Sequence, residues 1–167
     1  SNVYGDFTGP LNEKKSLLYR LNLGYENTDG FRDLQGLTTF IVAPSFTYIL
    51  SDRTQLNADI TYNNNMGKLD RGLAIHGDGD LFSVPFNSTQ SAASDFMSEN
   101  TFNLSFALSH QLAKGLLFNS TYLYSSYLEN TEEHAQQHAY QSTIDGKQDF
   151  SKVEMRFEKR HRHITSN

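Results

Sequence analysis

The chain has 167 residues, with 14 Lys and Arg against 19 Asp and Glu, and a formal net charge of -5 at pH 7. This acidic balance argues against nucleic-acid binding, which needs basic patches for the phosphates. The absence of cysteine excludes a disulfide framework and a thiolate metal site. No apolar run reaches the roughly 18 residues of a transmembrane helix, although aromatic residues make up 13% of the chain.

Apolar and polar side chains alternate over several segments, which predicts strands with one apolar and one polar face. Residues 3–7 are interpreted as the end of a strand, followed by a turn around Pro10. Pro44 cannot donate a ladder hydrogen bond, so we expect a bulge or a local break there. Six clear strands are predicted, at residues 17–26, 38–50, 55–64, 100–111, 116–128 and 152–164.

The connections between these strands alternate in length. Residues 51–54 and 112–115 form tight turns, whereas residues 65–98 and 129–150 form long polar loops. Within the second loop, residues 131–140 are compatible with a short helix. Sequential antiparallel strands then place the tight turns at one end and the long loops at the other, which is typical of outer-membrane barrels.

Strand length favours a membrane protein. Strands of globular domains have about 5–6 residues, whereas a strand that crosses an outer membrane needs about 9–11. We therefore predict an all-β fold, in which antiparallel up-and-down strands form part of a transmembrane β-barrel. A soluble β-sandwich binding module with irregular loops is the alternative that the pattern leaves open.

The alternation also predicts which side chains face lipid. The predicted lipid face carries Tyr19, Leu21, Leu23, Phe46, Leu56, Ile60, Phe102, Leu104 and Phe106. The predicted polar lumen face carries Arg20, Asn22, Asn57, Asp59, Asn103 and Ser105. Interfacial aromatic girdles account for Tyr19, Tyr25, Tyr48, Tyr62, Tyr122 and Tyr124.

Several runs resemble one known family. These are GDFTGPLN at residues 5–12, LYRLN at 18–22, FIVAPSFTY at 40–48, SDRT at 51–54, and DRGL at 70–73. Their order and spacing resemble the early barrel of TonB-dependent ferric-siderophore receptors, over roughly residues 4–125. The resemblance implies a 22-stranded barrel, plugged by an N-terminal domain, that imports an iron chelate with energy from the TonB complex.

The chain departs from that family pattern because it shows neither a plug nor a TonB box. We therefore interpret residues 1–167 as a fragment of the barrel with about six strands. A closed eight-stranded barrel is an alternative, as is a structural or adhesive barrel without transport. The implied location is the bacterial outer membrane, and the implied partners are a ferric siderophore, outer-membrane lipid and, through the plug of the full-length receptor, the TonB complex.

Three residues in outward loops are candidates for ligand binding, namely Arg32, Arg71 and His76. Arginine supplies planar donors for chelate oxygens, although each residue is also compatible with a solvated loop charge. We expect no resident cofactor, and iron only as part of the transported chelate.

No pattern of residues indicates catalysis, so we expect no enzyme. His134 and His138 are spaced for one helix face, and His161 and His163 for one strand face. Both spacings can chelate a divalent metal. We favour solvated loop histidines, because the sequence specifies no third ligand.

Overall fold

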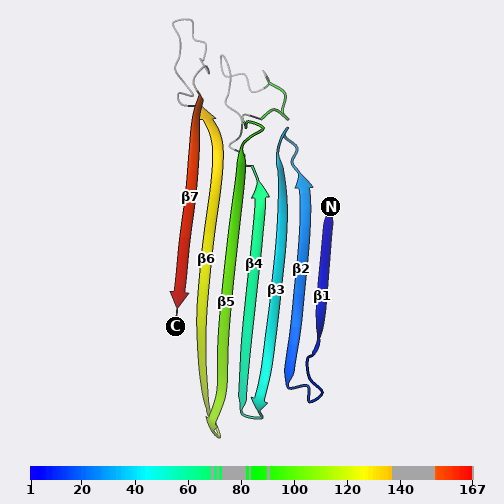
Figure 1. Ribbon diagram of the computed structural model, residues 1–167, viewed down its shortest axis with the longest axis vertical. Coiled ribbons are helices and arrows are strands. Elements are labelled where there is room, and N and C mark those ends of the chain that lie inside the picture. Colours follow the sequence, from blue (N-terminus) through cyan, green and yellow to red (C-terminus); the bar gives the residue numbers. More distant parts are fainter. Residues whose placement is uncertain are drawn as a thin grey trace, which may run out of the picture.

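The computed structural model describes residues 1–68, 70, 72, 82, 84–89, 91–136 and 153–166. These residues form one antiparallel sheet, in which every strand pairs with its neighbours in sequence (Figure 1). The all-β prediction is therefore confirmed. The strands are β1 (Asn2–Pro10), β2 (Leu17–Asp29), β3 (Gly36–Ser51), β4 (Thr54–Gly67), β5 (Phe96–Ala113), β6 (Leu116–Gln136) and β7 (Val153–Ser166).

Most strands are longer than the sequence predicts, mainly at the end that carries the long connections. β6 continues to Gln136, so the helix predicted at residues 131–140 is wrong as far as the structure describes them. The reason is non-local, because Glu132 pairs with Phe96 of β5, and Gln136 pairs with Val153 of β7. Ladder hydrogen bonds on both sides override the local helix propensity.

The register places each predicted set of side chains on one face. One apolar row crosses five strands through Tyr19, Phe46, Ala58, Phe106 and Tyr122. Directly opposed residues of antiparallel strands project to the same side of the sheet. The same register confirms that the nine residues of the predicted lipid face share one side, which is called here the apolar face.

The polar residues occupy the opposite side in the same way. Arg20, Ser45, Asp59 and Ser105 form a row across four strands. Asn22, Asn57 and Asn103 project to this side as well, because each is an even number of residues from a member of the row. This side is called the polar face.

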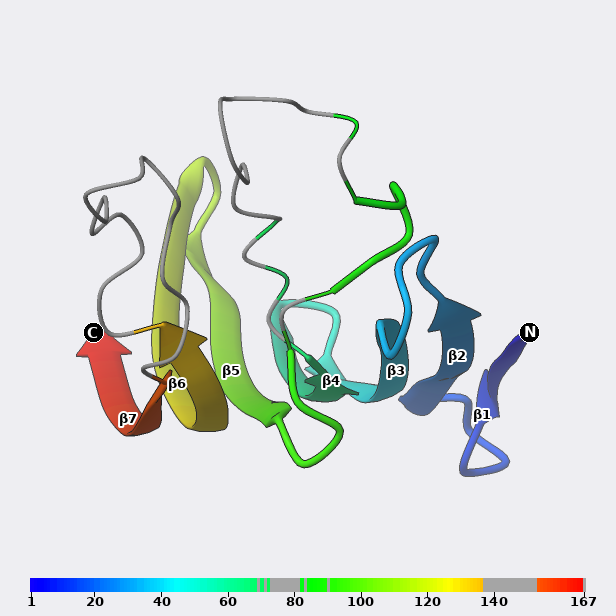
Figure 2. The same ribbon diagram turned by 90° about the horizontal axis from the view of Figure 1, so that it is seen from above.

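The sheet is a single curved layer (Figure 2). Among the described residues, no hydrophobic side chain is buried, and large apolar side chains stay exposed, such as Phe106 at 48% and Tyr122 at 41%. Phe40, Phe46 and Leu56, which project from the apolar face, are exposed as well. Such a face suits contact with lipid, because a contiguous apolar surface this large is rare on soluble monomers.

The two ends of the sheet differ as predicted. The turns at Asp52–Arg53 and at Lys114–Gly115 lie at one end. The β2–β3 connection, the described parts of the β4–β5 connection, and the paired ends of β6 and β7 at Gln136 and Val153 lie at the other (Figure 1). Gly115 has φ of 83°, which other residues adopt only with strain.

The expected irregularity at Pro44 is a local break without a shift. The β3–β4 ladder has no pair at Ala43 or Pro44, and it resumes in the same register, with Val42 opposite Tyr62 and Ser45 opposite Asp59. The register shift in this pair of strands lies instead between Ile49 and Ser51.

The described sheet is open. β1 pairs with β2, β7 pairs with β6, and the N- and C-terminal ends lie at opposite margins of the arc in Figure 2. The seven described strands therefore do not close on each other, in contrast to the eight-stranded alternative. Among the described residues, no helix has the length and hydropathy needed to cross a bilayer.

Candidate functional site at the long-loop end

The connection from β2 to β3 is a compact turn that presents Arg32. The amide of Gly30 donates to the carbonyl of Gln35 at 2.9 Å, and the amide of Gln35 donates to the carbonyl of Arg32 at 3.2 Å. Leu34 takes φ of 62°, which allows the chain to reverse within a few residues. The turn therefore holds Arg32 above the end of the sheet.

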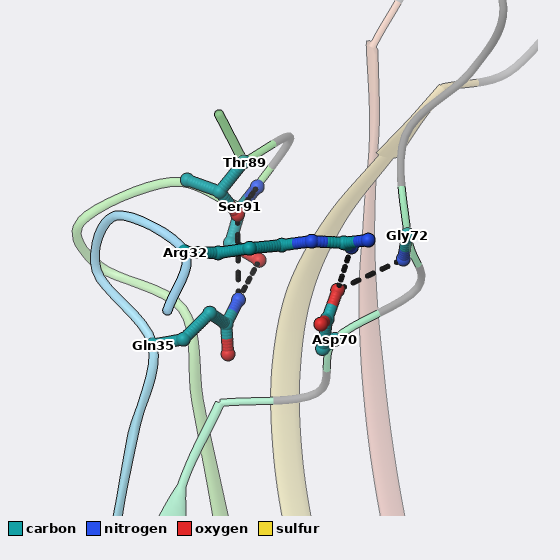
Figure 3. A network of polar contacts seen from close by, with 6 residues as sticks. All are labelled: Arg32, Gln35, Asp70, Gly72, Thr89 and Ser91. Atoms are coloured by element: carbon teal, nitrogen blue, oxygen red, sulfur yellow. Dashed lines mark hydrogen bonds and ion pairs between the residues drawn. The ribbon is translucent and has the colours of Figure 1, made fainter. Parts of the chain in front are cut away.

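Arg32 is already engaged by the protein (Figure 3). Its Nη1 donates to Oδ1 of Asp70 at 2.7 Å, and the same carboxylate oxygen accepts the amide of Gly72 at 2.9 Å. The guanidinium carbon lies 5.1 Å from the ring centre of Phe31, and the side chain is only 19% exposed. Of the predicted ligand residues, Arg32 is placed by the structure, whereas Arg71 and His76 lie outside the described residues.

Two hollows meet at Arg32. Their volumes are about 610 and 300 Å³, and Arg32, Gln35 and Lys68 line both of them. The Nε atom of Arg32 is buried and has no hydrogen-bond partner among the described residues. The larger hollow has the size of a small-molecule site, and a free guanidinium donor is suited to an acceptor oxygen.

Rows from both faces of the sheet line the larger hollow, since Leu37 and Gly67 are direct partners in a row of the polar face. Asn27, Thr38 and Met66, which line it, form one register row, and this row projects from the same face as Tyr25 and Phe40. The hollow therefore lies at the end of the sheet, where residues of both faces reach it.

A second group of residues lies on the polar face, at the same end of the sheet. Tyr127 Oη lies 2.7 Å from Glu99 Oε1 and 3.1 Å from Glu129 Oε2. Asn65 joins Glu99 at 3.4 Å and accepts from Thr39 at 3.0 Å. These five residues are called the luminal ladder, and they connect β3, β4, β5 and β6.

The ladder concentrates negative charge. Glu99 and Glu129 are direct cross-strand partners, an arrangement that is unfavourable for like charges. The Tyr127 hydroxyl has one proton, so it donates to one carboxylate at a time. Glu133, on the same face of β6, is only 6% exposed. This part of the wall therefore favours cations and hydrogen-bond donors and disfavours anions.

The sequence alone did not reveal the ladder, because two of the predicted strands are too short: the fourth begins after Glu99, and the fifth ends before Glu129. Glu129 lies in the loop predicted at residues 129–150, and Glu99 lies just outside the predicted fourth strand. The signal was the continued alternation, since Thr101 and Glu99, and Tyr127 and Glu129, keep a spacing of two. Continuing the alternation by one more polar position in each strand reaches Glu99 and Glu129.

The histidine pairs remain predictions. His161 and His163 lie in β7 opposite Leu128 and Ser126, so they share a face, but their side chains lie outside the described part. The His134 side chain and all of His138 also lie outside it. Within the described residues, no group of three or more His, Cys, Asp or Glu side chains is arranged to hold a metal ion.

Comparison with known proteins identifies the kind of barrel. The chain is 40% identical over 67 residues to the metal-pseudopaline receptor CntO of Pseudomonas aeruginosa strain UCBPP-PA14, and 39% identical over 67 residues to that of strain PAO1. Each match covers 40% of this chain and 10% of the relative. No protein-family model matches the chain.

Solved structures show the same fold. The ferripyoverdine receptor of the Pseudomonas aeruginosa outer membrane superposes with a TM-score of 0.75 and 17% identity, over 84% of this chain and 19% of that one. The predicted resemblance to the TonB-dependent receptors is confirmed. The ferric-catecholate import receptor Fiu of E. coli K12, in its closed form, superposes with a TM-score of 0.67 and 14% identity, over 98% of this chain and 26% of that one.

The predicted location in the bacterial outer membrane is confirmed with the fold. The chain spans about a tenth of the length of the curated relatives that it matches. It covers 19% and 26% of the two solved receptor chains. The relatives are named as receptors.

Proposed function

We propose that residues 1–167 are a barrel segment of a TonB-dependent receptor that binds a metal chelate at the cell surface and imports it with energy from the TonB complex. The observation that carries this proposal is the sheet, which has strands of membrane-spanning length and matches a siderophore receptor with a TM-score of 0.75. The exposed apolar face supports outer-membrane lipid as the partner on that side. We further propose that a plug elsewhere in the full receptor contacts TonB.

The substrate class that we favour is a ferric siderophore. The two structural neighbours are named for ferripyoverdine and for ferric catecholates. A second candidate is a metal–pseudopaline chelate, because the relatives with 40% and 39% identity carry that name. In both cases iron or another metal is cargo, and no resident cofactor is part of the proposal.

The luminal ladder restricts the net charge that we expect for the chelate. Carboxylates at Glu99 and Glu129 repel an anionic ligand that passes this part of the wall. We therefore expect a chelate that is neutral or cationic overall, or one that presents hydroxyl or amide donors to the wall. Arg71 and His76 remain candidates for capture of the chelate in the outward loops.

Uptake by the complete receptor tests the proposal. Cells that lack their own receptor and express this one should accumulate radioactive iron from a ferric siderophore, and deletion of TonB should abolish the accumulation. Accumulation of a pseudopaline-bound metal, with no uptake of ferric siderophores, would select the second candidate. Binding without accumulation in TonB-positive cells would contradict transport and would favour a structural or adhesive barrel.

A matched pair of variants tests the ladder. Tyr127→Phe removes the hydroxyl that holds the two carboxylates, and should raise the half-saturating chelate concentration about two- to tenfold. Tyr122→Phe makes the same change on the apolar face, where the side chain is 41% exposed, and should leave uptake unchanged. Equal effects of the two variants would remove the ladder from the proposed passage.

A further inference from the structure

The turn between β2 and β3 is joined to both limbs of the β4–β5 connection. On the limb that follows β4, Arg32 pairs with Asp70. On the limb that precedes β5, Asp33 pairs with Asn87, whose Nδ2 donates to Oδ1 at 3.1 Å. Gln35 Nε2 reaches the same limb at Ser91 Oγ (3.1 Å) and Thr89 Oγ1 (3.3 Å), as Figure 3 shows. These three sets of contacts are called the clasp.

The base of the connection is closed independently of the clasp. Lys68 Nζ donates to the carbonyl oxygens of Ala92 and Ala93, each at 2.8 Å, so it ties the two limbs together. Asp95, which is 6% exposed, accepts the amide of Ala92 at 2.9 Å. At Gly67 the backbones of β3 and β4 approach so closely that a Cβ would lie 2.7 Å from the carbonyl oxygen of Gly36. The clasp therefore acts on a loop with a fixed base.

Arg32 is placed to act within the clasp and not on a ligand directly. One guanidinium nitrogen is used by Asp70, the guanidinium lies over the Phe31 ring, and the side chain is mostly covered. Asp70 leaves the edge formed by Nε and Nη2 as the one open to a two-pronged contact, and the Nε atom on that edge is buried. Removal of Arg32 instead frees the limb that carries Asp70.

We propose that Arg32 is a positioning residue, which acts through Asp70 to hold the β4–β5 connection against the β2–β3 turn. In the receptor, the clasp keeps the described limbs of that connection in one place at the long-loop end of the sheet. The uptake experiment below rests on the proposed function. The cross-linking experiment does not, because it measures the contact between the two loops without any ligand.

Engineered cysteines test the docking of the two loops, because the chain has no cysteine of its own. The amide of Asp33 donates to the carbonyl of Asn87 at 2.7 Å, so these two positions are within reach of a disulfide. The complete receptor with Asp33→Cys and Asn87→Cys should cross-link on mild oxidation in the membrane. A pair at Asp33→Cys and Asp52→Cys, at opposite ends of the sheet, should not.

Arg32→Ala and Asp70→Ala, each added to the Asp33→Cys and Asn87→Cys pair, should slow cross-linking about fivefold, and both together should slow it no further. The matched control is Arg53→Ala, in the turn at the other end, which should leave the rate unchanged. Absence of the cross-link in the parent would overturn the docked arrangement. An unchanged rate in Arg32→Ala would overturn the role of Arg32.

The disulfide also separates positioning from ligand contact. Without the cysteines, Arg32→Ala should lower chelate uptake about fivefold. In the oxidised cysteine receptor the same substitution should have no effect on uptake, and the defect should return on reduction. A defect that persists in the oxidised form would make Arg32 a direct ligand contact and would overturn the proposal. A parent receptor that imports no chelate contradicts the proposed function, while cross-linking still decides the clasp.

Discussion

Single residues along each strand differ sharply in environment, although they are neighbours in sequence. Leu104 pairs with Ile60 and Tyr124 on the apolar face, and Ser105 pairs with Asp59 and Leu123 on the polar face. Near Leu104, the rings of Phe102 and Tyr124 lie 6.2 Å apart between centres. A charged side chain introduced at position 104 would face lipid, whereas one introduced at position 105 would face the polar side of the sheet.

Leu104→Arg should therefore lower the free energy of unfolding of the receptor by about 2–4 kcal/mol, because Leu104 lies in the middle of the apolar face of β5. Ser105→Arg should change it by only about 0.5 kcal/mol. Urea unfolding of the complete receptor in lipid vesicles measures both values. Equal losses at the two positions would contradict the assignment of the faces.

At the level of elements, the strands differ in length. β4 has 14 residues, whereas β5 has 18 and β6 has 21. β5 extends past β4 mainly at the end with the tight turns, through residues 111–113, and β6 extends past β4 mainly at the end with the long connections, through residues 132–136. The luminal ladder and the clasp both lie at this end. The opposite end carries tight turns, as expected for the periplasmic side of a barrel.

This arrangement predicts which segments are reachable from outside the cell. A peptide tag inserted beside Phe86, which is 78% exposed in the β4–β5 connection, should bind antibody on intact cells. A tag inserted beside Lys114, in the β5–β6 turn, should bind only after permeabilisation. Antibody binding at Lys114 on intact cells would reverse the orientation. Staining of both tags in permeabilised cells is the control for expression.

At the level of the whole molecule, the described sheet has no hydrophobic core and two strands with a free edge. β1 pairs with β2 alone, and β7 pairs with β6 alone. Each free edge presents backbone N–H and C=O groups without ladder partners, and each such group costs several kcal/mol in hydrocarbon. Further strands must pair with β1 and β7 before the backbone hydrogen-bonding groups of these edges have partners in a bilayer.

The chain expressed as residues 1–167 alone should therefore fail to give a monomeric barrel in detergent. The measurements are size-exclusion chromatography and the shift in gel mobility on heating that closed barrels show. We expect aggregates or mixed oligomers without the shift, whereas the complete receptor should be monodisperse and heat-modifiable. A monodisperse monomer with the shift would instead support a closed barrel built from this chain alone.

The sequence by itself determined the strands, their two faces and the order of turns and long connections. These features are local, since a spacing of two assigns Leu104 and Ser105 to opposite faces without knowledge of any partner strand. Tight turns such as the one at Gly115 are local as well, because they depend on the conformational preferences of a few residues. This local information also sufficed for the resemblance to the receptor family.

Only the tertiary structure decided where the strands end and what the loops contact. The extension of β6 past Leu128 depends on pairing with β5 and β7, and it brings Glu129 opposite Glu99. Arg32 was identified from sequence as a candidate for ligand binding, but its partner Asp70 is 38 residues away and lies in another loop. Contacts of this kind follow from strand register and loop packing, which join distant parts of the chain and leave no periodic signal in the sequence.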